Sequence, residues 1–207
     1  MTGRCVIFAA GQMDITPLLP RPEQGDFIIA ADAGIRNAAA LGAAPDLVMG
    51  DMDSAAEEEV PEGALLFPVR KDDTDLMLAI KKGIEMGYQD FLIYGATGGR
   101  LDHTIASIQS LSYLLSHGCR GILVDGEQWV TLIRDGSVRI PAGYRHVSVF
   151  SYTERCRGVT LRGLSYPLED GELDQNFPLG VSNSMVEDSA SVSVKEGSLL
   201  IVLSDYR

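Results

Sequence analysis

The sequence predicts an α/β fold for its first part and an all-β fold for its second part. Up to about residue 125, short runs that are apolar throughout alternate with segments that have the period of a helix. This alternation implies a mainly parallel sheet with flanking helices and right-handed crossovers. After Gly126 the segments are short, rich in Val, Ile, Thr and Ser, and divided by Gly-containing turn signals. That pattern predicts an antiparallel all-β sandwich, so we expect domains at 1–125 and 126–207.

Each apolar run of the first part is expected to form one strand of the parallel sheet. These runs cover residues 6–10, 27–31, 47–49, 65–67, 91–94 and 122–124. Intervening segments with helical character cover residues 33–41, 74–86 and 101–117. In the last of them, apolar residues recur as a stripe on one face of the expected helix, at Leu101, Ile105, Ile108, Leu111 and Leu115.

The second part is expected to consist of short strands. They cover residues 129–134, 138–141, 146–151, 159–161, 190–194 and 199–203. Between them, residues 165–180 form the longest irregular stretch, which is acidic. A domain of roughly 80 residues is marginal when it stands alone. We therefore expect it to pack on the first domain or on a partner chain.

Composition and charge limit the classes of function. The chain has 207 residues, 45% of them hydrophobic, and a net charge of -12. It lacks the basic clusters that bind nucleic acid and any apolar run of membrane-spanning length. The three widely spaced cysteines suit neither a disulfide framework nor a zinc site. With no signal-peptide pattern at the N-terminus, the expected location is cytoplasmic.

Two runs of carboxylates each follow an apolar run that is read as a strand. Asp51 and Asp53 follow residues 47–49, and Asp72, Asp73 and Asp75 follow the next run. Two acids two residues apart lie on one side of an extended segment, where they suit Mg²⁺. The alternative is that these acids only precede helix caps at Ser54 and Thr74 and complement the helix dipole.

A third loop is rich in glycine and follows residues 91–94. Gly95, Gly98 and Gly99 allow a close approach of the backbone to a ligand, and the helix expected after them offers free N–H groups to an anion. Arg100 adds a bidentate donor for phosphate. The loop lacks the Gly-Lys-Ser/Thr ending of a Walker A motif. His103 is either an exposed first-turn residue or a catalyst. Acids, glycines and an arginine together indicate phosphoryl-type chemistry on a nucleotide.

Five motifs, taken in order, resemble those of the thiamin pyrophosphokinase family. They are Ala31–Gly34, Gly50–Ser54, Lys71–Leu76, Gly95–His103 and Gly180–Asn183, and the resemblance runs from about residue 5 to residue 204. It implies an N-terminal α/β domain, a C-terminal β-sandwich, and a homodimer with active sites in the cleft between subunits. It also implies ATP as co-substrate and Mg²⁺ as cofactor. The thiamin hydroxyl would attack the β-phosphorus of ATP, giving thiamin diphosphate and AMP.

The resemblance also assigns roles to residues. Those expected to hold or orient Mg-ATP are Asp51, Asp53, Asp72 and Asp75, with Asp32 near them. Those expected on the nucleotide side are Gly98, Gly99, Arg100, Asp102 and His103. Ser182 and Asn183, on a turn of the β domain, would help to bind thiamin in the neighbouring subunit's site. Some family members stack an aromatic residue of the C-terminal region on thiamin, and this chain has no tryptophan there.

Two other functions are compatible with parts of this pattern. A Mg²⁺-dependent glycosyltransferase could use Asp51 and Asp53 on a nucleotide sugar, but this leaves the acids of 71–75 without a role. A non-catalytic nucleotide sensor could use the β domain for interaction with another protein. It would bind ATP without releasing AMP.

Overall fold

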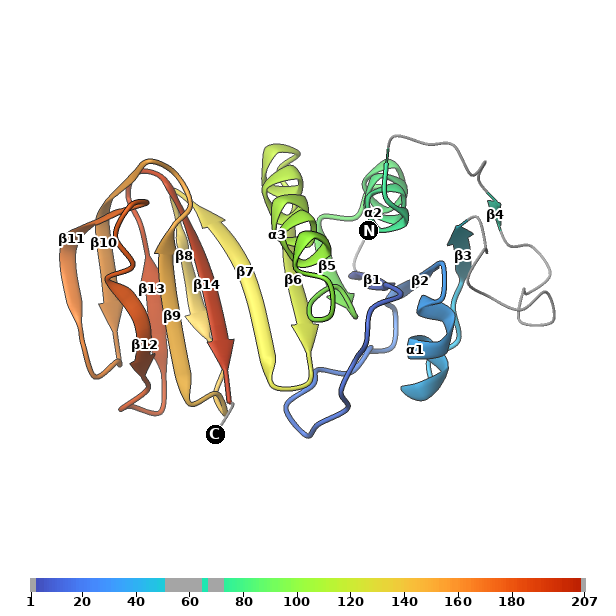
Figure 1. Ribbon diagram of the computed structural model, residues 1–207, viewed down its shortest axis with the longest axis horizontal. Coiled ribbons are helices and arrows are strands. Elements are labelled where there is room, and N and C mark those ends of the chain that lie inside the picture. The colour runs from blue at the N-terminus through green and yellow to red at the C-terminus, as the bar shows by residue number, and fades with distance from the viewer. Residues whose placement is uncertain (1–2, 51–64, 67–72, 206–207) are drawn as a thin grey trace. The chain divides into compact units, whose positions relative to one another are not determined.

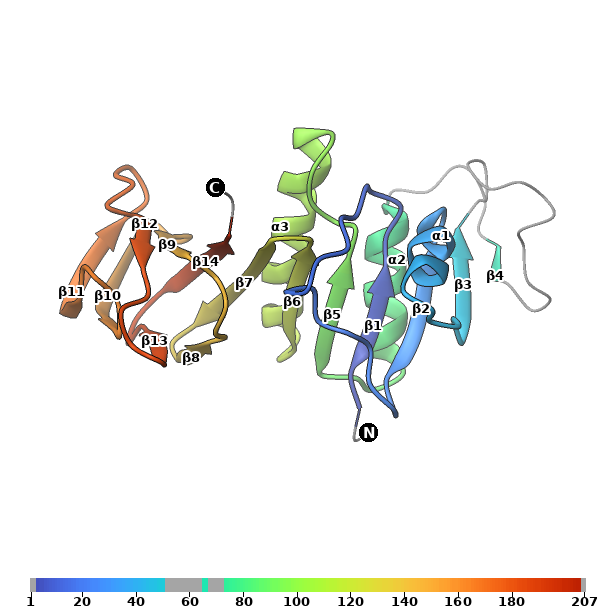
Figure 2. The same ribbon diagram turned by 90° about the horizontal axis from the view of Figure 1, so that it is seen from below.

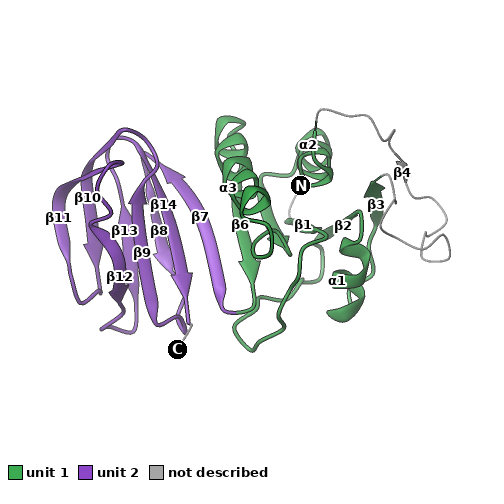
Figure 3. Cartoon of the chain, in the orientation of Figure 1, with its two compact units in different colours: residues 1–126 green, residues 127–207 purple. Residues whose placement is uncertain are grey.

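The computed structural model describes residues 3–50, 65–66 and 73–205 (Figure 1). It divides into two units, Met1–Gly126 and Glu127–Arg207 (Figure 3). The boundary expected from the sequence lies one residue earlier. Each unit has its own buried core.

Unit 1 contains a parallel sheet. Its strands are β1 (Cys5–Phe8), β2 (Phe27–Ala31), β3 (Leu47–Gly50), β4 (Leu65–Leu66), β5 (Asp90–Tyr94) and β6 (Arg120–Asp125). They are ordered β6-β5-β1-β2-β3-β4, and every adjacent pair is parallel. The chain proceeds outwards from β1 in one direction and later returns to build β5 and β6 on the other side. The carboxyl ends of β1 and β5 therefore form a topological switch point, where ligands bind in open α/β sheets.

Three helices cover the two faces of this sheet. They are α1 (Gly34–Ala40), α2 (Asp75–Glu85) and α3 (Leu101–Ser116). Figure 2 shows α1 on one face and both α2 and α3 on the other. Helix α2 lies close to the sheet because it presents Gly83 there: a Cβ at this position would lie 2.6 Å from Phe91 Cε1 and 2.8 Å from Cys5 Sγ.

The face of α3 that is buried differs from the predicted stripe. The buried residues are Ser107, Ser110, Leu111 and Leu114. Leu101 is 73% exposed and Ile105 is 50% exposed. The prediction was wrong for the first half of the helix because small hydroxyl residues take the inward positions there. Their hydroxyls donate to helix carbonyls, Ser107 to His103 and Ser110 to Ser107, so they can be buried at little cost.

Unit 2 is an antiparallel β-sandwich. Its strands are β7 (Gln128–Arg134), β8 (Ser137–Ile140), β9 (His146–Ser151), β10 (Arg155–Arg162), β11 (Leu168–Asp174), β12 (Gly180–Ser184), β13 (Ala190–Ser193) and β14 (Ser198–Ser204). One layer has the order β12-β9-β14-β7 and the other β11-β10-β13-β8. Alternate residues are buried, as along β9, where Val147, Val149 and Ser151 are inside. The predicted fold class, α/β followed by a β-sandwich, is confirmed.

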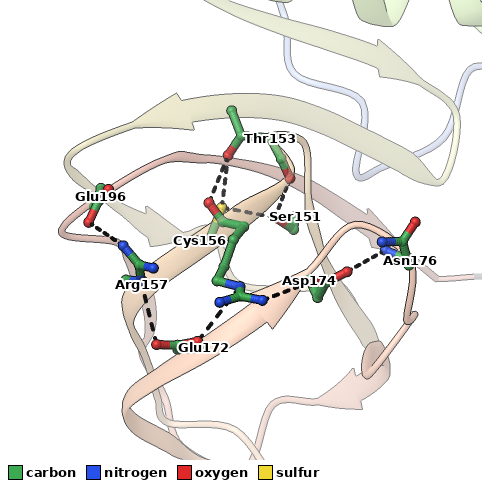
Figure 4. Close-up of polar contacts among 9 residues, drawn as sticks. Ser151, Thr153, Cys156, Arg157, Glu172, Asp174, Asn176 and Glu196 are labelled. Atoms are coloured by element: carbon green, nitrogen blue, oxygen red, sulfur yellow. Dashed lines mark hydrogen bonds and ion pairs between the residues drawn. The ribbon is translucent and has the colours of Figure 1, made fainter.

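Strand β11 lies where the sequence predicted an irregular stretch. It is an edge strand that pairs with β10 alone in its sheet and buries little more than Leu173, so it has no apolar alternation to recognise. Opposite charges join the pair (Figure 4): Glu172 lies 3.6 Å from Arg157 and 3.9 Å from Arg155. The buried Cys156 thiol accepts a hydrogen bond from the Ser151 hydroxyl (Figure 4). It donates to the Ser198 carbonyl. An edge strand that carries charges resists pairing with other chains.

Among the described residues, no helix combines the length and the apolar character that crossing a bilayer requires.

Candidate active site

A cavity of about 380 Å³ opens at the switch point of unit 1. The loops that follow β1, β2 and β5 line it, together with the first turns of α2 and α3. The polar or glycine residues among its lining are Gly11, Asp32, Thr74, Asp75, Gly95, Thr97, Gly98, Asp102, His103, Ser107 and Ser110. Sequence segments far apart in the chain thus meet at one site.

Asp32 is placed by an unusual backbone conformation. It has φ 51°, in the left-handed region that few residues other than glycine adopt, and its N–H donates to the Met49 carbonyl at 2.7 Å. Gly50, the last residue of β3, packs against it, and a Cβ there would lie 3.0 Å from Asp32 Cα. Strained residues held by their surroundings are frequent at functional sites. The carboxyl end of β3 is therefore fixed beside Asp32, at the edge of the cavity.

The glycine loop after β5 is held against the loop after β1. Gly11 N–H donates to the Gly95 carbonyl at 3.0 Å, and the Asn37 amide donates to the carbonyls of Ala9 and Gly11 at 2.7 and 2.8 Å. Gly95 has φ 63° and lies so close to these groups that a Cβ would be 2.7 Å from Asn37 Nδ2. Glycine is needed there for both its conformation and its size.

At the start of α3, some of the expected phosphate-binding residues line the cavity and others do not. Asp102 and His103 line the cavity, as does Gly98. Gly99 and Arg100 are not among the lining residues in the described part of the chain. Arg100 Nη2 instead pairs with Asp102 Oδ2 at 2.6 Å, and its side chain is 73% exposed. The hydrogen bond from Arg100 lowers the pKa of Asp102 below its usual value.

At the start of α2, Thr74 caps the helix and Asp75 lines the cavity. The Thr74 hydroxyl accepts from Met77 N–H at 3.2 Å, as the capping alternative predicted. Asp73 points to a different partner, Lys81, at 2.6 Å. Asp72, like Asp51 and Asp53, lies outside the described residues.

The described part of the cavity has donors that suit Mg²⁺. Asp32 and Asp75 provide hard carboxylate oxygens within the wall that also contains the glycine loop. Magnesium commonly takes one or two protein carboxylates and completes its shell with water and substrate phosphate. Within residues 3–50, 65–66 and 73–205, no three or more His, Cys, Asp or Glu residues cluster as a metal site by themselves. The donor set therefore fits a cation that is bound together with a polyphosphate.

In unit 2, Ser182 and Asn183 lie on strand β12, not on a turn. Gly180, Ser182 and Asn183 are residue types that favour turns, which is why a turn was expected. The strand is irregular here, with a register shift between Gly180 and Asn183 in the pairing with β9 and φ 58° at Ser182. Asn183 is 5% exposed. Its Oδ1 accepts from Tyr166 N–H at 2.9 Å, and its Nδ2 donates to the Tyr166 carbonyl at 2.7 Å. The amide thus fixes the backbone of Tyr166. Tyr166 itself is 76% exposed.

Both units match models of one protein family. Residues 22–123 match the catalytic domain of thiamin pyrophosphokinase, and residues 137–199 match its vitamin B1 binding domain. The chain belongs to the thiamin pyrophosphokinase family. The resemblance carried by the five sequence motifs is confirmed, and the family is favoured over a nucleotide-sugar transferase or a non-catalytic sensor.

Individual members of the thiamin pyrophosphokinase family show the same likeness over the whole chain. The thiamine pyrophosphokinase of Bacillus subtilis (strain 168) is 27% identical over an alignment of 207 positions, which covers 96% of this chain and 97% of that protein. A crystal structure of thiamine pyrophosphokinase from Bacillus subtilis superimposes with a TM-score of 0.86 at 25% identity, over 99% of this chain and 100% of that one. The Candida albicans enzyme shares the fold at 15% identity, with a TM-score of 0.75 over 98% and 90% of the two chains.

Several site residues of this thiamin pyrophosphokinase family member escaped the sequence analysis. Gly11 ends the first apolar run and could have been recognised as a loop at the carboxyl end of a strand. Tyr166 could have been found as an aromatic residue in an otherwise polar stretch. Thr97 and its partner Asp125 gave no signal, because their contact joins residues 28 positions apart.

Proposed function

We propose that this chain transfers the diphosphoryl group of ATP to the hydroxyl of thiamin, giving thiamin diphosphate and AMP. The observation that carries this proposal is the cavity at the switch point, which joins two carboxylates to a glycine loop inside the segment matched by the family's catalytic domain. The thiamin oxygen forms a bond to the β-phosphorus, and the bond between the β-phosphorus and the oxygen that bridges it to the α-phosphorus breaks. AMP leaves with that oxygen, and the hydroxyl proton is released to water.

The protein's contribution to this reaction is positioning and charge neutralisation. Phosphoryl transfer asks little covalent chemistry of an enzyme, so orientation and electrostatic stabilisation dominate. Gly95–Gly98 bring backbone close to the polyphosphate. Asp102 and His103, in the first turn of α3, lie at the same wall. For Arg100 to contact phosphate, its guanidinium would have to break the ion pair with Asp102 and bind the phosphate oxygens instead.

Magnesium is part of the proposal. Asp32 and Asp75 would hold it in the described cavity, together with Asp51, Asp53 and Asp72 of the adjoining segments. When bound, Mg²⁺ neutralises charge on the polyphosphate and draws electron density from the reacting phosphorus. The carboxylates would fix the position of the cation beside the polyphosphate.

For thiamin, we propose that the Tyr166 ring forms a stacking platform. Asn183 holds the Tyr166 backbone through two hydrogen bonds, so an exposed ring is presented from a fixed position. Aromatic faces attract cations such as the thiazolium of thiamin. The Ser182 hydroxyl would donate or accept one hydrogen bond to the ligand. Asn183 then acts through Tyr166 and does not touch thiamin itself.

A homodimer with shared sites is proposed as well. Unit 2 exposes several large apolar side chains, namely Tyr166, Phe177, Leu179, Val181 and Val186. Exposed apolar side chains that form a contiguous patch are typical of a surface that another molecule covers. We propose that this surface meets a second copy of the chain and completes its active site. A cytoplasmic location, where ATP is abundant, also stays a prediction.

The direct test is to incubate the protein with thiamin, ATP and Mg²⁺ and to separate the products by chromatography. We expect AMP and thiamin diphosphate in equal amounts, and no AMP when thiamin is omitted. Tight binding of ATP with no AMP in any condition would instead indicate a nucleotide sensor. Turnover of a nucleoside-diphosphate sugar would indicate a glycosyltransferase.

A further inference from the structure

One carboxylate of unit 1 joins two loops beside the cavity. Asp125 is the last residue of β6 and is half-buried. Its Oδ1 accepts from the backbone N–H of Asp14 at 3.1 Å, and its Oδ2 accepts from the Thr97 hydroxyl at 3.2 Å. The two oxygens of this single side chain are thus engaged by the loop after β1 and by the glycine loop after β5.

These are the loops that form the cavity wall. Gly11, Thr97 and Gly98 all line it. A second tether reinforces the arrangement, because the Thr16 hydroxyl donates to the Gly126 carbonyl at 2.6 Å. The end of β6 is therefore hydrogen-bonded to both loops. Asp125 itself is not among the described residues that line the cavity.

The glycine loop depends on such a tether. Gly95, Gly98 and Gly99 all have positive φ, at 63°, 81° and 62°. Glycine backbone loses more conformational freedom on ordering than any other, so a loop with three of them is not rigid by itself. Thr97 lies between them, is 4% exposed, and connects the loop to Asp125 through its hydroxyl. A Cβ at Gly98 would lie 3.7 Å from Asp125 Oδ2, so the carboxylate sits directly beside the turn.

We propose that Asp125 is a positioning residue for the nucleotide, which holds the Gly95–Gly99 loop in the shape that receives the polyphosphate. It does so as a hydrogen-bond acceptor and not through its charge, since a carboxylate this close to a polyphosphate repels it. The inference rests on the proposed function only in naming ATP as the ligand.

The electrostatic surroundings agree with this role. Burial raises the pKa of Asp125, and the nearby Asp14 carboxylate adds to that effect, while the hydrogen bonds from Asp14 N–H and Thr97 lower it. The net result is a carboxyl that is less readily ionised than usual. An asparagine of the same shape should therefore replace it: its oxygen can accept from Asp14 N–H, and its NH₂ can donate to the Thr97 hydroxyl.

The test measures the Kd of Mg-ATP by calorimetry, without turnover, for the variants Asp125→Ala, Asp125→Asn, Thr97→Val and Thr97→Ser. Asp125→Ala and Thr97→Val should each weaken ATP binding by on the order of tenfold, because each leaves the loop without its tether. Asp125→Asn and Thr97→Ser should bind ATP nearly as the wild type does. The double variant Asp125→Ala/Thr97→Val should bind ATP no more weakly than Asp125→Ala alone, because Asp125→Ala already removes the contact that Thr97→Val removes.

Controls separate positioning from general stability. Asp90→Ala removes a carboxylate at the opposite end of β5, where Asp90 forms an ion pair with Arg120 of β6 at 2.8 Å. It should leave ATP binding unchanged. The KM for thiamin should stay the same in all variants.

Several results would overturn the proposal. One is an Asp125→Ala protein that binds ATP like the wild type, and another is an Asp125→Asn protein that binds ATP as weakly as Asp125→Ala does. A third is an Asp125→Ala protein that loses affinity for ATP and for thiamin together with thermal stability. If Asp125→Ala does not fold, the comparison of Thr97→Val with Thr97→Ser decides. A wild type that binds Mg-ATP but releases no AMP contradicts the proposed reaction alone.

Discussion

Asp73 and Asp75 are two residues apart, yet the structure gives them different surroundings. Asp75 lines the cavity, whereas Asp73 pairs with Lys81 at 2.6 Å. The acidic run that the sequence presents as one cluster therefore divides into a candidate metal ligand and an ion pair on the surface of α2.

A matched pair of variants tests this division. Asp75→Asn should lower kcat/KM by about 100-fold, because a lost charged ligand removes transition-state stabilisation on the order of 3 kcal/mol. Asp73→Asn should change kcat/KM little, because Asp73 pairs with Lys81 and is not among the residues that line the cavity in the described part of the chain. Steady-state kinetics at saturating Mg²⁺ measure both. Equal losses in the two variants would contradict the assignment of Asp75.

The role of Tyr166 can be tested by changing its ring alone. Tyr166→Phe keeps an aromatic face and should retain thiamin use, whereas Tyr166→Ala should raise the KM for thiamin by on the order of tenfold. The KM for ATP should not change, because the nucleotide residues belong to unit 1. If Tyr166→Ala behaves like the wild type with varied thiamin, the stacking platform lies elsewhere.

At the scale of the elements, two glycines of one loop separate conformation from space. Gly95 and Gly99 have nearly the same φ, 63° and 62°. A Cβ at Gly95 would meet Asn37, Ala9 and Gly11 within 2.9 Å, while a Cβ at Gly99 would meet nothing within 4 Å. The tight contact between the loop after β1 and the loop after β5 thus depends on Gly95 and not on Gly99.

Thermal or urea denaturation of two alanine variants measures this difference. Gly99→Ala should destabilise the protein by about 1 kcal/mol, the cost of a left-handed backbone for a residue with a Cβ. Gly95→Ala should cost about 3 kcal/mol, because a steric clash is added. Gly95→Ala should also weaken ATP binding. Equal destabilisation would mean that the loops can separate freely.

Elements with a strong pattern were predictable, and those defined by long-range contacts were not. The strands of the parallel sheet are apolar throughout because both faces are covered, so the sequence alone located them and the loops at their carboxyl ends. The buried face of α3 was missed because Ser107 and Ser110 satisfy their hydroxyls within the helix. Strand β11 was missed because an acidic edge strand buries almost nothing. Arg100 was expected to contact phosphate, whereas the structure shows it paired with Asp102. The sequence alone does not indicate which partner an exposed arginine takes.

At the scale of the whole molecule, acid should weaken the fold through Asp26. Its carboxylate side chain is 4% exposed and accepts from Arg4 at 2.7 and 3.1 Å, before β2 and β1 begin. Burial by itself raises the pKa of Asp26, but the hydrogen bonds from Arg4 and from backbone N–H groups lower it below its ordinary value. Because the folded-state pKa is lowered, this stabilisation is present above the unfolded pKa and is lost as the pH falls through the folded one.

Asp26→Asn tests this pH dependence. The variant should be less stable than the wild type at neutral pH by on the order of 2 kcal/mol, the contribution of hydrogen bonds to a charged group. The difference should shrink as the pH falls below about 4, because the Asp26 carboxyl of the unfolded wild-type chain is then protonated before that of the folded chain. Urea titrations at several pH values measure it. Glu23→Gln, which changes a 75% exposed partner of Arg4, should show little effect at any pH.

The proposed homodimer predicts that two impaired variants recover activity when they are mixed, which a monomer with its own site would not do. If each site combines unit 1 of one chain with unit 2 of its partner, Asp75→Asn damages the site from one side and Tyr166→Ala from the other. In a mixed dimer, one site then receives both lesions and the other receives neither. At thiamin concentrations far below the KM, where both variants are impaired, random exchange of equal amounts of the two should therefore restore about one quarter of wild-type activity, as expected for a two-fold symmetric dimer. The mixture should be assayed after unfolding and refolding together, with each variant refolded alone as control, and its mass measured by light scattering. Activity that never exceeds that of the separate variants, or a fully active monomer, would show that each chain builds its own site.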